Sequence, residues 1–334
     1  MSLKVGSGAK AQIQICFICT IRPILFIGWF NTFSATFFCT HSAQSAHPHC
    51  QRSTPLSLFS YGTAIFLLIS AGATTTKLAQ MKLSELLLSV MMVQSSLITM
   101  VVTISLQKYT TKQIDHLHGL VYIVENRRNY DIPHFFDGQF RRDVHAMLYK
   151  FFGPYLLLTV IIISASLYNY QNLTGELVFK LVTLLINIFS NLSNSQMTIL
   201  FIHIYTILLR RCHEQIENTL TLHFDKNTSS FTWTKVSLRR KLQSLQKLHL
   251  SILANFQLVR SVFSANLLFF WIGFCEILIA NFFLVILSIR QQRACTDEEI
   301  LSFVLYVAAF LGSNVFFNKA QDLRDEVRLL SSAF

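Results

Sequence analysis

The chain has 334 residues, of which 52% are hydrophobic and only 13% are charged, and its formal net charge is +11. Soluble domains carry roughly 25% charged residues, so the composition excludes a disordered chain and argues against an ordinary soluble enzyme. The apolar residues are grouped in long blocks, which is typical of a membrane protein.

The first apolar block, Ala11–Cys39, differs from the later ones because it holds Arg22 and Pro23 near its middle. Arginine at mid-bilayer costs about 2.5–3.5 kcal/mol, and proline interrupts a helix. We therefore expect this block to lie at the membrane interface or to pack against other helices. Whether it also spans the membrane is left open.

A membrane-spanning helix needs about 20 mostly apolar residues. Six later stretches meet this requirement, each bounded by charged residues: 56–73, 86–107, 151–170, 181–209, 261–289 and 300–318. The sequence therefore predicts an all-α membrane protein with a polytopic helix bundle over residues 56–318. An N-terminal cytoplasmic or interfacial segment, 1–55, precedes the bundle, and a cytoplasmic amphipathic segment, 319–334, follows it.

The basic residues predict the orientation of the bundle. Segments 1–55, 107–150, 210–260 and 318–334 together hold 23 of the 28 Lys and Arg residues. Cytoplasmic loops are enriched in Lys and Arg, so these segments and the N-terminus are predicted to be cytoplasmic. The positive charge then faces anionic membrane lipid, and nucleic acid is not an expected partner. Asn172, in a predicted outer loop, begins an Asn-Leu-Thr sequence that fits a glycosylation site.

The long cytoplasmic segments contain apolar stripes at helical spacing, which indicate amphipathic helices. One stripe leads into the fifth span and consists of Leu242, Leu245, Leu248, Ile252, Phe256, Val259 and Phe263. A shorter one lies near the end of the chain and consists of Ala320, Leu323, Val327 and Leu330. Such helices either lie on the membrane surface or pack together as a cytoplasmic anchor region. The length and narrowness of the first stripe favour packing.

Three short segments resemble those of insect gustatory receptors. They are Leu248-His249 with Leu253, Phe263-Ser264 and Leu267-Leu268; Leu208-Leu209-Arg210-Arg211-Cys212 followed by Ile216-Glu217-Asn218-Thr219-Leu220; and Ile21-Arg22-Pro23-Ile24-Leu25. The resemblance implies a seven-helix taste chemoreceptor of the plasma membrane of sensory neurons. Such receptors bind a small-molecule tastant in the outer half of the bundle and gate a cation channel as homo- or hetero-tetramers.

The resemblance stops short of the family's last helix. Its Thr-Tyr and Gln-Phe signature has no counterpart before Phe334, so we expect this chain to lack the pore-lining seventh helix. The resemblance therefore implies channel activity for a complete form, and independent activity of this chain is in doubt.

Polar residues inside the predicted spans are candidates for ligand binding, because lipid offers them no hydrogen-bonding partner. Glu276 lies near the middle of the fifth span, and an ionisable residue at that depth is a functional candidate. Further polar residues lie at similar depth, namely Gln94, Ser95 and Ser96 in the second span and Asn191, Ser193, Asn194, Ser195 and Gln196 in the fourth. Tyr168, Phe303 and Tyr306, together with Tyr170, lie toward the outer ends and could supply aromatic walls. The alternative is that the polar groups only join helices and that the aromatic residues only mark the interface.

Enzymatic and metal chemistry find no support in the sequence. His41, His47, His49 and Cys50 are of zinc-ligand types, but their spacing matches no standard zinc finger, so we predict neither a metal nor a cofactor. The chain also lacks a P-loop, an H-E-x-x-H, a G-x-S-x-G and a G-x-G-x-x-G motif.

Two other classes of membrane protein remain as alternatives. A G-protein-coupled receptor would require Ala11–Cys39 to span, which would give seven helices and an outside N-terminus. Its Asp-Arg-Tyr and Asn-Pro-x-x-Tyr motifs are missing. A secondary transporter would show inverted repeats and broken helices, and neither is visible.

Overall fold

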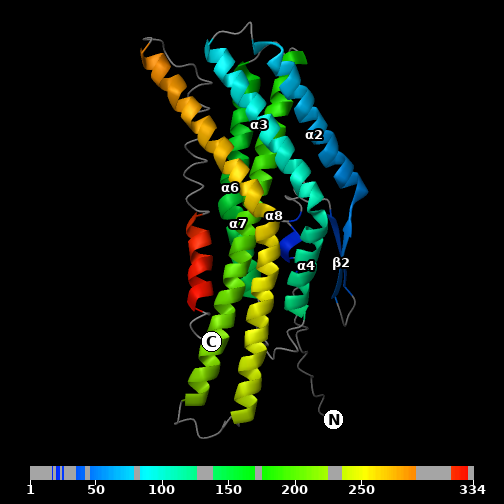
Figure 1. Ribbon diagram of the computed structural model, residues 1–334, viewed down its shortest axis with the longest axis vertical. Helices are drawn as coiled ribbons and strands as arrows, with labels where there is room; N and C mark the ends of the chain where they lie inside the picture. The colour runs from blue at the N-terminus through cyan, green and yellow to red at the C-terminus, as the bar shows by residue number, and fades with distance from the viewer. Residues whose placement is uncertain are drawn as a thin grey trace, which may run out of the picture.

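The computed structural model shows a long helical bundle (Figure 1). It describes residues 17, 20–22, 25, 35–41, 46–78, 83–125, 138–169, 175–224, 235–290 and 317–329. The main helices are α2 (Thr54–Thr75), α3 (Leu83–Lys108), α4 (Thr110–Glu125), α6 (Gly138–Asn169), α7 (Gly175–Phe224) and α8 (Lys235–Arg290). A C-terminal helix covers residues 317–329.

Five of the six predicted spans coincide with described helices, namely α2, α3, α6, α7 and α8, except that residue 170 of the third span lies outside the described residues. The sixth, Ile300–Asn318, lies outside the described residues except for its last two. Two described segments, Thr54–Thr75 and Leu238–Phe269, are long and apolar enough to cross a membrane by length and composition alone.

The N-terminal segment contains a β-hairpin, which departs from the all-α prediction. Strand β1 (Ala35–His41) pairs antiparallel with β2 (Ala46–Arg52), in a register that sets Ala35 opposite Arg52. Aromatic and threonine residues favour strands, and each strand of an isolated pair has a free edge that tolerates a proline such as Pro48. Strand β1 thus begins inside the apolar block that was predicted to be interfacial.

The described residues near the middle of the first apolar block pack against the bundle, which is one of the two arrangements that the sequence predicts for this block. Phe17, Ile21 and Leu25 are at most 5% exposed and belong to the same core as Phe140 of α6. The ring centroids of Phe17 and Phe140 lie 6.1 Å apart. Arg22 remains exposed, so this cation does not enter the core.

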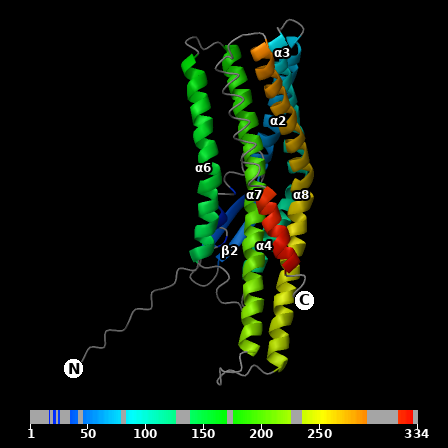
Figure 2. The same ribbon diagram turned by 90° about the vertical axis from the view of Figure 1, so that its left-hand side faces the viewer.

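The bundle has two halves that share the long helices α7 and α8 (Figures 1 and 2). The upper half consists of α2, α3 and residues 151–169 of α6, 175–200 of α7 and 261–290 of α8. The lower half consists of α4, the C-terminal helix and residues 138–150 of α6, 201–224 of α7 and 235–260 of α8. Helices α7 and α8 run antiparallel and contact each other.

In the upper half, small and polar side chains are buried while large apolar side chains are exposed. The buried face of α2 consists of Ser57, Ser60, Thr63, Ala64, Leu67, Ser70 and Ala71. Its exposed face includes Leu58, Phe59, Ile65, Leu68 and Ile69, each 51–66% exposed. In α3 the same pattern sets buried Ser96, Thr99 and Thr103 against exposed Leu97, Val101 and Ile104.

The lower half has the arrangement of a water-soluble helix bundle. Leu245, Leu248 and Ile252 of the predicted stripe are at most 1% exposed and belong to the main core. Leu323 of the C-terminal helix joins the same core. Cations on α8 in this half, such as Lys247, are exposed. The prediction that these stripes are packing surfaces is confirmed for the described residues.

Candidate functional site

A polar layer joins α2, α3 and α7 in the interior of the upper half. The hydroxyls of Ser70 on α2 and Thr183 on α7 are hydrogen-bonded at 2.9 Å. One turn further along α7, the Asn187 Nδ2 donates to the Ser96 Oγ of α3 at 3.0 Å. Both pairs are buried and connect segments far apart in the sequence, so they fix how these three helices face one another.

The polar residues of α7 lie on one buried face. Thr183, Asn187, Ser190, Asn194 and Thr198 follow one another at steps of three or four residues, and none is more than 6% exposed. Residues at these spacings share one side of an α-helix. The same side continues into Phe201 and Tyr205, which are fully buried. We call the five polar residues the polar column, and Phe201 and Tyr205 lie directly below it.

Asn194 retains unused hydrogen-bonding capacity in the middle of this column. It is 1% exposed, and within the described part of the chain neither its Oδ1 nor its Nδ2 has a hydrogen-bond partner. The same holds for the Oδ1 of Asn187. A buried amide without a partner costs about 1–3 kcal/mol. These atoms can therefore accept from and donate to a small polar molecule or water.

The structure describes the side chains of only two of the predicted ligand-binding residues, and they lie at different heights. Gln94 of α3 is half-buried, and Asn194 of α7 is buried. Because Asn187 contacts Ser96 and α3 and α7 run in the same direction (Figure 1), Asn194 lies level with Thr103, roughly 13 Å along α3 from Gln94 at the α-helical rise. Gln94 and Asn194 therefore do not form one compact group.

The other candidates lie on described helices or outside the described residues. Tyr168 is near the end of α6, Asn191 is in α7 and Glu276 is in α8, and only their helical backbone is described. Asn172, Phe303 and Tyr306 lie outside the described residues. Their predicted roles in glycosylation and ligand binding stay predictions.

Sequence reasoning missed Ser70, Thr183 and Asn187, which make the two interhelical bonds. The available signal was the spacing of Ser and Thr on α2, where Ser57, Ser60, Thr63 and Ser70 recur on one face. In an apolar helix such a face packs against other helices. Depth in the span was used instead, and depth does not say which side of a helix a residue occupies.

A second buried cluster lies below the polar column, where α4 crosses α7 and α8. The ring of His116 meets that of Phe201 edge-on, with centroids 4.7 Å apart, and lies 5.9 Å from that of Tyr205. The Asn255 Nδ2 of α8 donates to the carbonyl oxygen of His116 at 3.0 Å. Gly119 permits this crossing, because a Cβ there would lie 2.8 Å from the Cγ of Asn255.

Burial sets the protonation of this cluster and of a nearby thiol. It lowers the pKa of His116 from 6.5 to about 3, so the imidazole stays neutral at physiological pH. Burial also raises the pKa of Cys212 from 9.0 to about 12. Because the thiolate is the nucleophile, Cys212 is a core residue and not a reactive one.

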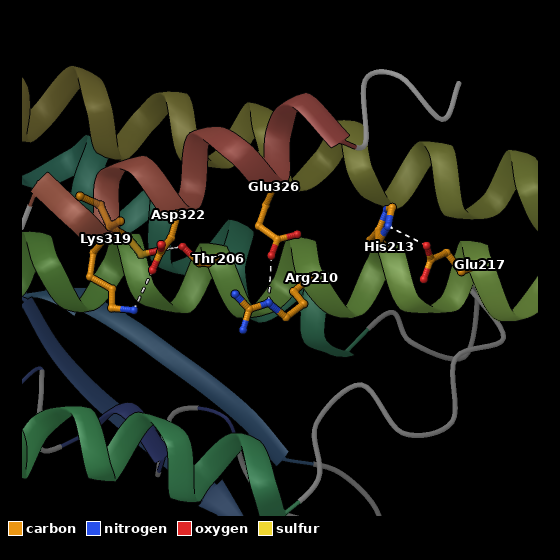
Figure 3. Close-up of polar contacts among 8 residues, drawn as sticks. Thr206, Arg210, His213, Glu217, Lys319, Asp322 and Glu326 are labelled. Carbon is orange, nitrogen blue, oxygen red and sulfur yellow. Dashed lines mark hydrogen bonds and ion pairs between the residues drawn. The ribbon is translucent and has the colours of Figure 1, made fainter.

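An ion pair joins the C-terminal helix to α7 (Figure 3). The Arg210 Nε of α7 lies 2.9 Å from the Glu326 Oε1. A second pair lies within the C-terminal helix, where the Lys319 Nζ is 2.8 Å from the Asp322 Oδ2. A third contact, 3.1 Å between the His213 Nε2 and the Glu217 Oε1, lies within α7. The Arg210–Glu326 pair joins helices far apart in the sequence, although Arg210 is 56% exposed, so its contribution is modest.

The residues considered for zinc lie in the hairpin, His41 in β1 and His47, His49 and Cys50 in β2. In the portion of the chain with described side chains, no group of three or more His, Cys, Asp and Glu residues could hold a metal ion.

No protein-family model matches the chain, and a comparison with curated proteins finds no match. The resemblance to insect gustatory receptors therefore remains a prediction from the sequence, and the proposal below depends on the packing described above.

Proposed function

We propose that this chain is a multi-pass membrane chemoreceptor of the insect gustatory receptor type. In this proposal it binds a small organic tastant within the upper half and gates a cation channel as part of a homo- or hetero-tetramer. The observation that carries the proposal is the reversed burial of the upper half, where Ser, Thr and Asn side chains are buried and many Leu, Ile and Phe side chains are exposed.

Reversed burial supports a lipid environment because exposed apolar side chains and buried polar side chains are both unfavourable for a protein in water. Exposed apolar surface costs roughly 25 cal/mol per Å² in water, whereas lipid tails favour it. Polar groups in a bilayer need partners inside the bundle, and the bonds of Ser70 and Asn187 are of this kind. The proposed spans remain those predicted from the sequence, with the N-terminus in the cytoplasm.

In α8 the proposed membrane segment begins after Arg260, although the segment Leu238–Phe269 meets the length and hydropathy criteria. Below Arg260 the helix exposes Arg239, Arg240 and Lys247 and buries Leu245 and Leu248. Above Arg260 its exposed positions include many large apolar residues, among them Leu268, Ile272 and Ile279. Lipid favours the second surface and penalises the first.

The buried amide of Asn194 supports a polar ligand site in the upper half. Among the described residues, the Asn194 side chain has no hydrogen-bond partner. A molecule that carries a hydroxyl or an amine can supply one. Thermal unfolding of the purified chain with a panel of sugars, amines and alkaloids tests the proposal. We expect at least one compound to raise the unfolding temperature, and we expect Asn194→Leu to remove that rise. Asn218→Leu, at an exposed position on the same helix, is the matched control.

A rise that persists in Asn194→Leu would contradict the site, and the absence of any rise would contradict tastant binding. Protease protection of an N-terminal tag tests the orientation separately. An exterior tag would favour the G-protein-coupled receptor alternative.

A further inference from the structure

We infer that five basic residues form a belt around the bundle that binds anionic phosphate headgroups of membrane lipids. The basic belt consists of Arg52 at the end of β2, Lys108 at the end of α3, Lys150 in α6, Arg260 in α8 and Lys319 in the C-terminal helix. The inference rests on the membrane location proposed above and adds the level and the lipid class of the contact.

Two of these residues can be placed along α7 from the hydrogen bonds of the upper half. Ser70 contacts Thr183, so the two residues lie at one level. Arg52 is as far from Ser70 in the sequence as Phe201 is from Thr183, and both lie on the lower side. Ser96 contacts Asn187, and Lys108 lies as many residues below Ser96 as Ile199 lies below Asn187. Because every α-helix rises by the same amount per residue and Arg52 lies only two residues before α2 begins at Thr54, Arg52 and Lys108 lie near the level of Ile199–Phe201.

The lower half gives the same level independently. The Arg211 guanidinium lies over the Phe140 ring at 5.9 Å, and Lys150 lies as far above Phe140 as Phe201 lies above Arg211. Arg210 contacts Glu326, and Lys319 lies as far above Glu326 as His203 lies above Arg210. The basic residues of α6 and of the C-terminal helix therefore lie level with residues 201–203 of α7.

Arg260 completes the belt from α8. It lies between Phe256, whose ring is 5.3 Å from that of Tyr205, and Phe263, whose ring is 6.1 Å from that of Phe201. Five elements that are separate in the sequence thus place a cation within about one helical turn of the same level. This is also the level at which burial changes from reversed to ordinary.

The belt residues are available to an external anion. Arg52, Lys108, Lys150 and Arg260 are exposed, and within the described part of the chain none of these four forms an ion pair. Lys319 is half-buried and pairs with Asp322. Tyr149, beside Lys150, is 79% exposed, and tyrosine is enriched where lipid tails meet headgroups. An exposed acid near this level is Asp115 of α4.

Lipid phosphate fits this arrangement better than free phosphate because the belt lies at the lower edge of the exposed apolar surface of the upper half. Lys and Arg keep their alkyl stems on apolar surface and extend the charge toward headgroups. In α7 the distance from Lys180 to the belt level is roughly 30 Å at the α-helical rise, which equals the hydrocarbon thickness of a bilayer. The anionic lipids of the cytoplasmic leaflet attract basic residues at such a boundary.

Vesicle reconstitution of the full chain tests the lipid preference. The thermal unfolding temperature is measured in phosphatidylcholine and in phosphatidylcholine mixed with phosphatidylserine. We expect phosphatidylserine to raise it, and the variant R52Q/K108Q/K150Q/R260Q to lose more than half of that rise. The control R239Q/R240Q/K247Q removes exposed charges from the lower half and should keep the rise. An equal rise in the belt variant, or the same rise from inorganic phosphate alone, would overturn the inference.

Depth measurements keep the inference testable if the belt variant does not fold. A fluorescent amino acid is introduced singly at positions 52, 108, 150, 260, 68 and 247, and quenchers are placed on lipid headgroups or acyl chains. Position 68 should respond to acyl quenchers, position 247 to neither, and the four belt positions to headgroup quenchers. Quenching at 68 without headgroup quenching at the belt positions would reject the belt alone. No acyl quenching at position 68 would reject the membrane location.

Discussion

Replacement of Gly119 by alanine tests the close crossing of α4 and α8. Glycine within a helix is normally about 1 kcal/mol less favourable than alanine, so the change would stabilise an uncrowded helix. At Gly119, however, the new Cβ would lie 2.8 Å from the Cγ and 3.0 Å from the Nδ2 of Asn255. The Asn255 side chain would have to move, and its 3.0 Å bond to the His116 carbonyl oxygen would break.

The expected cost follows from these opposing effects. A lost hydrogen bond that leaves a buried amide without a partner costs about 1–3 kcal/mol, and Asn255 is only 6% exposed. After subtraction of the helix propensity gain of about 1 kcal/mol, Gly119→Ala should lower the free energy of unfolding by up to about 2 kcal/mol. Gly72→Ala is the matched control, because no atom lies within 4 Å of its added Cβ.

A double-mutant cycle isolates the contact itself. Asn255→Ala removes the bond but also the obstruction, so Gly119→Ala should no longer destabilise the chain when it is made in the Asn255→Ala background. The assay is denaturant unfolding of the purified chain followed by circular dichroism. Stabilisation by Gly119→Ala equal to that by Gly72→Ala, or simple additivity with Asn255→Ala, would refute the crossing described here.

Three further changes probe the two halves. Leu245→Ala should lower the free energy of unfolding by about 2–4 kcal/mol through cavity formation, since Leu245 is fully buried. Leu250→Ala, at a 57% exposed position, should change it by less than about 0.5 kcal/mol. Equal effects of the two changes in denaturant unfolding would contradict the assigned buried face. Ser70→Ala combined with Thr183→Val should give a coupling energy of about 0.6–1.7 kcal/mol in a double-mutant cycle, and no coupling would argue against their 2.9 Å bond. Burial lowers the pKa of His116 to about 3 from 6.5, so this group's contribution to stability is complete above pH 6.5 and is lost as the pH falls toward 3. His116→Gln should therefore reduce the dependence of the unfolding temperature on pH over that interval. An unchanged dependence would contradict burial of the ring.

Sequence reasoning located the helices better than it located their contacts. Charge boundaries placed five spans within observed helices, because an apolar run of sufficient length leaves few other structures. The stripe from Leu242 to Phe263 was also readable, since its period fixes one face. By contrast, the bond between Ser96 and Asn187 depends on how two helices are rotated against each other. That rotation is set by packing along the whole bundle, which one sequence does not display.

The β-hairpin and the crossing at Gly119 escaped prediction for related reasons. Ala35–His41 was part of an apolar block, and hydropathy does not distinguish a short strand from a buried helical turn. A single glycine in a helical segment carries no sign of what approaches it. Only the position of Asn255, more than a hundred residues later, explains why residue 119 has no side chain.

The 56 residues of α8 form one uninterrupted helix. At the α-helical rise its stretch below Arg260 is a stiff arm of roughly 38 Å. With the crossing at Asn255 near the middle of the helix acting as a fulcrum, a tilt of about 5° in the upper segment displaces the far end by about 3 Å, through lever geometry alone. A small molecule lodged among Asn187, Asn194 and their neighbours therefore has a direct mechanical route to the loop end near Lys235, without melting any intervening turn.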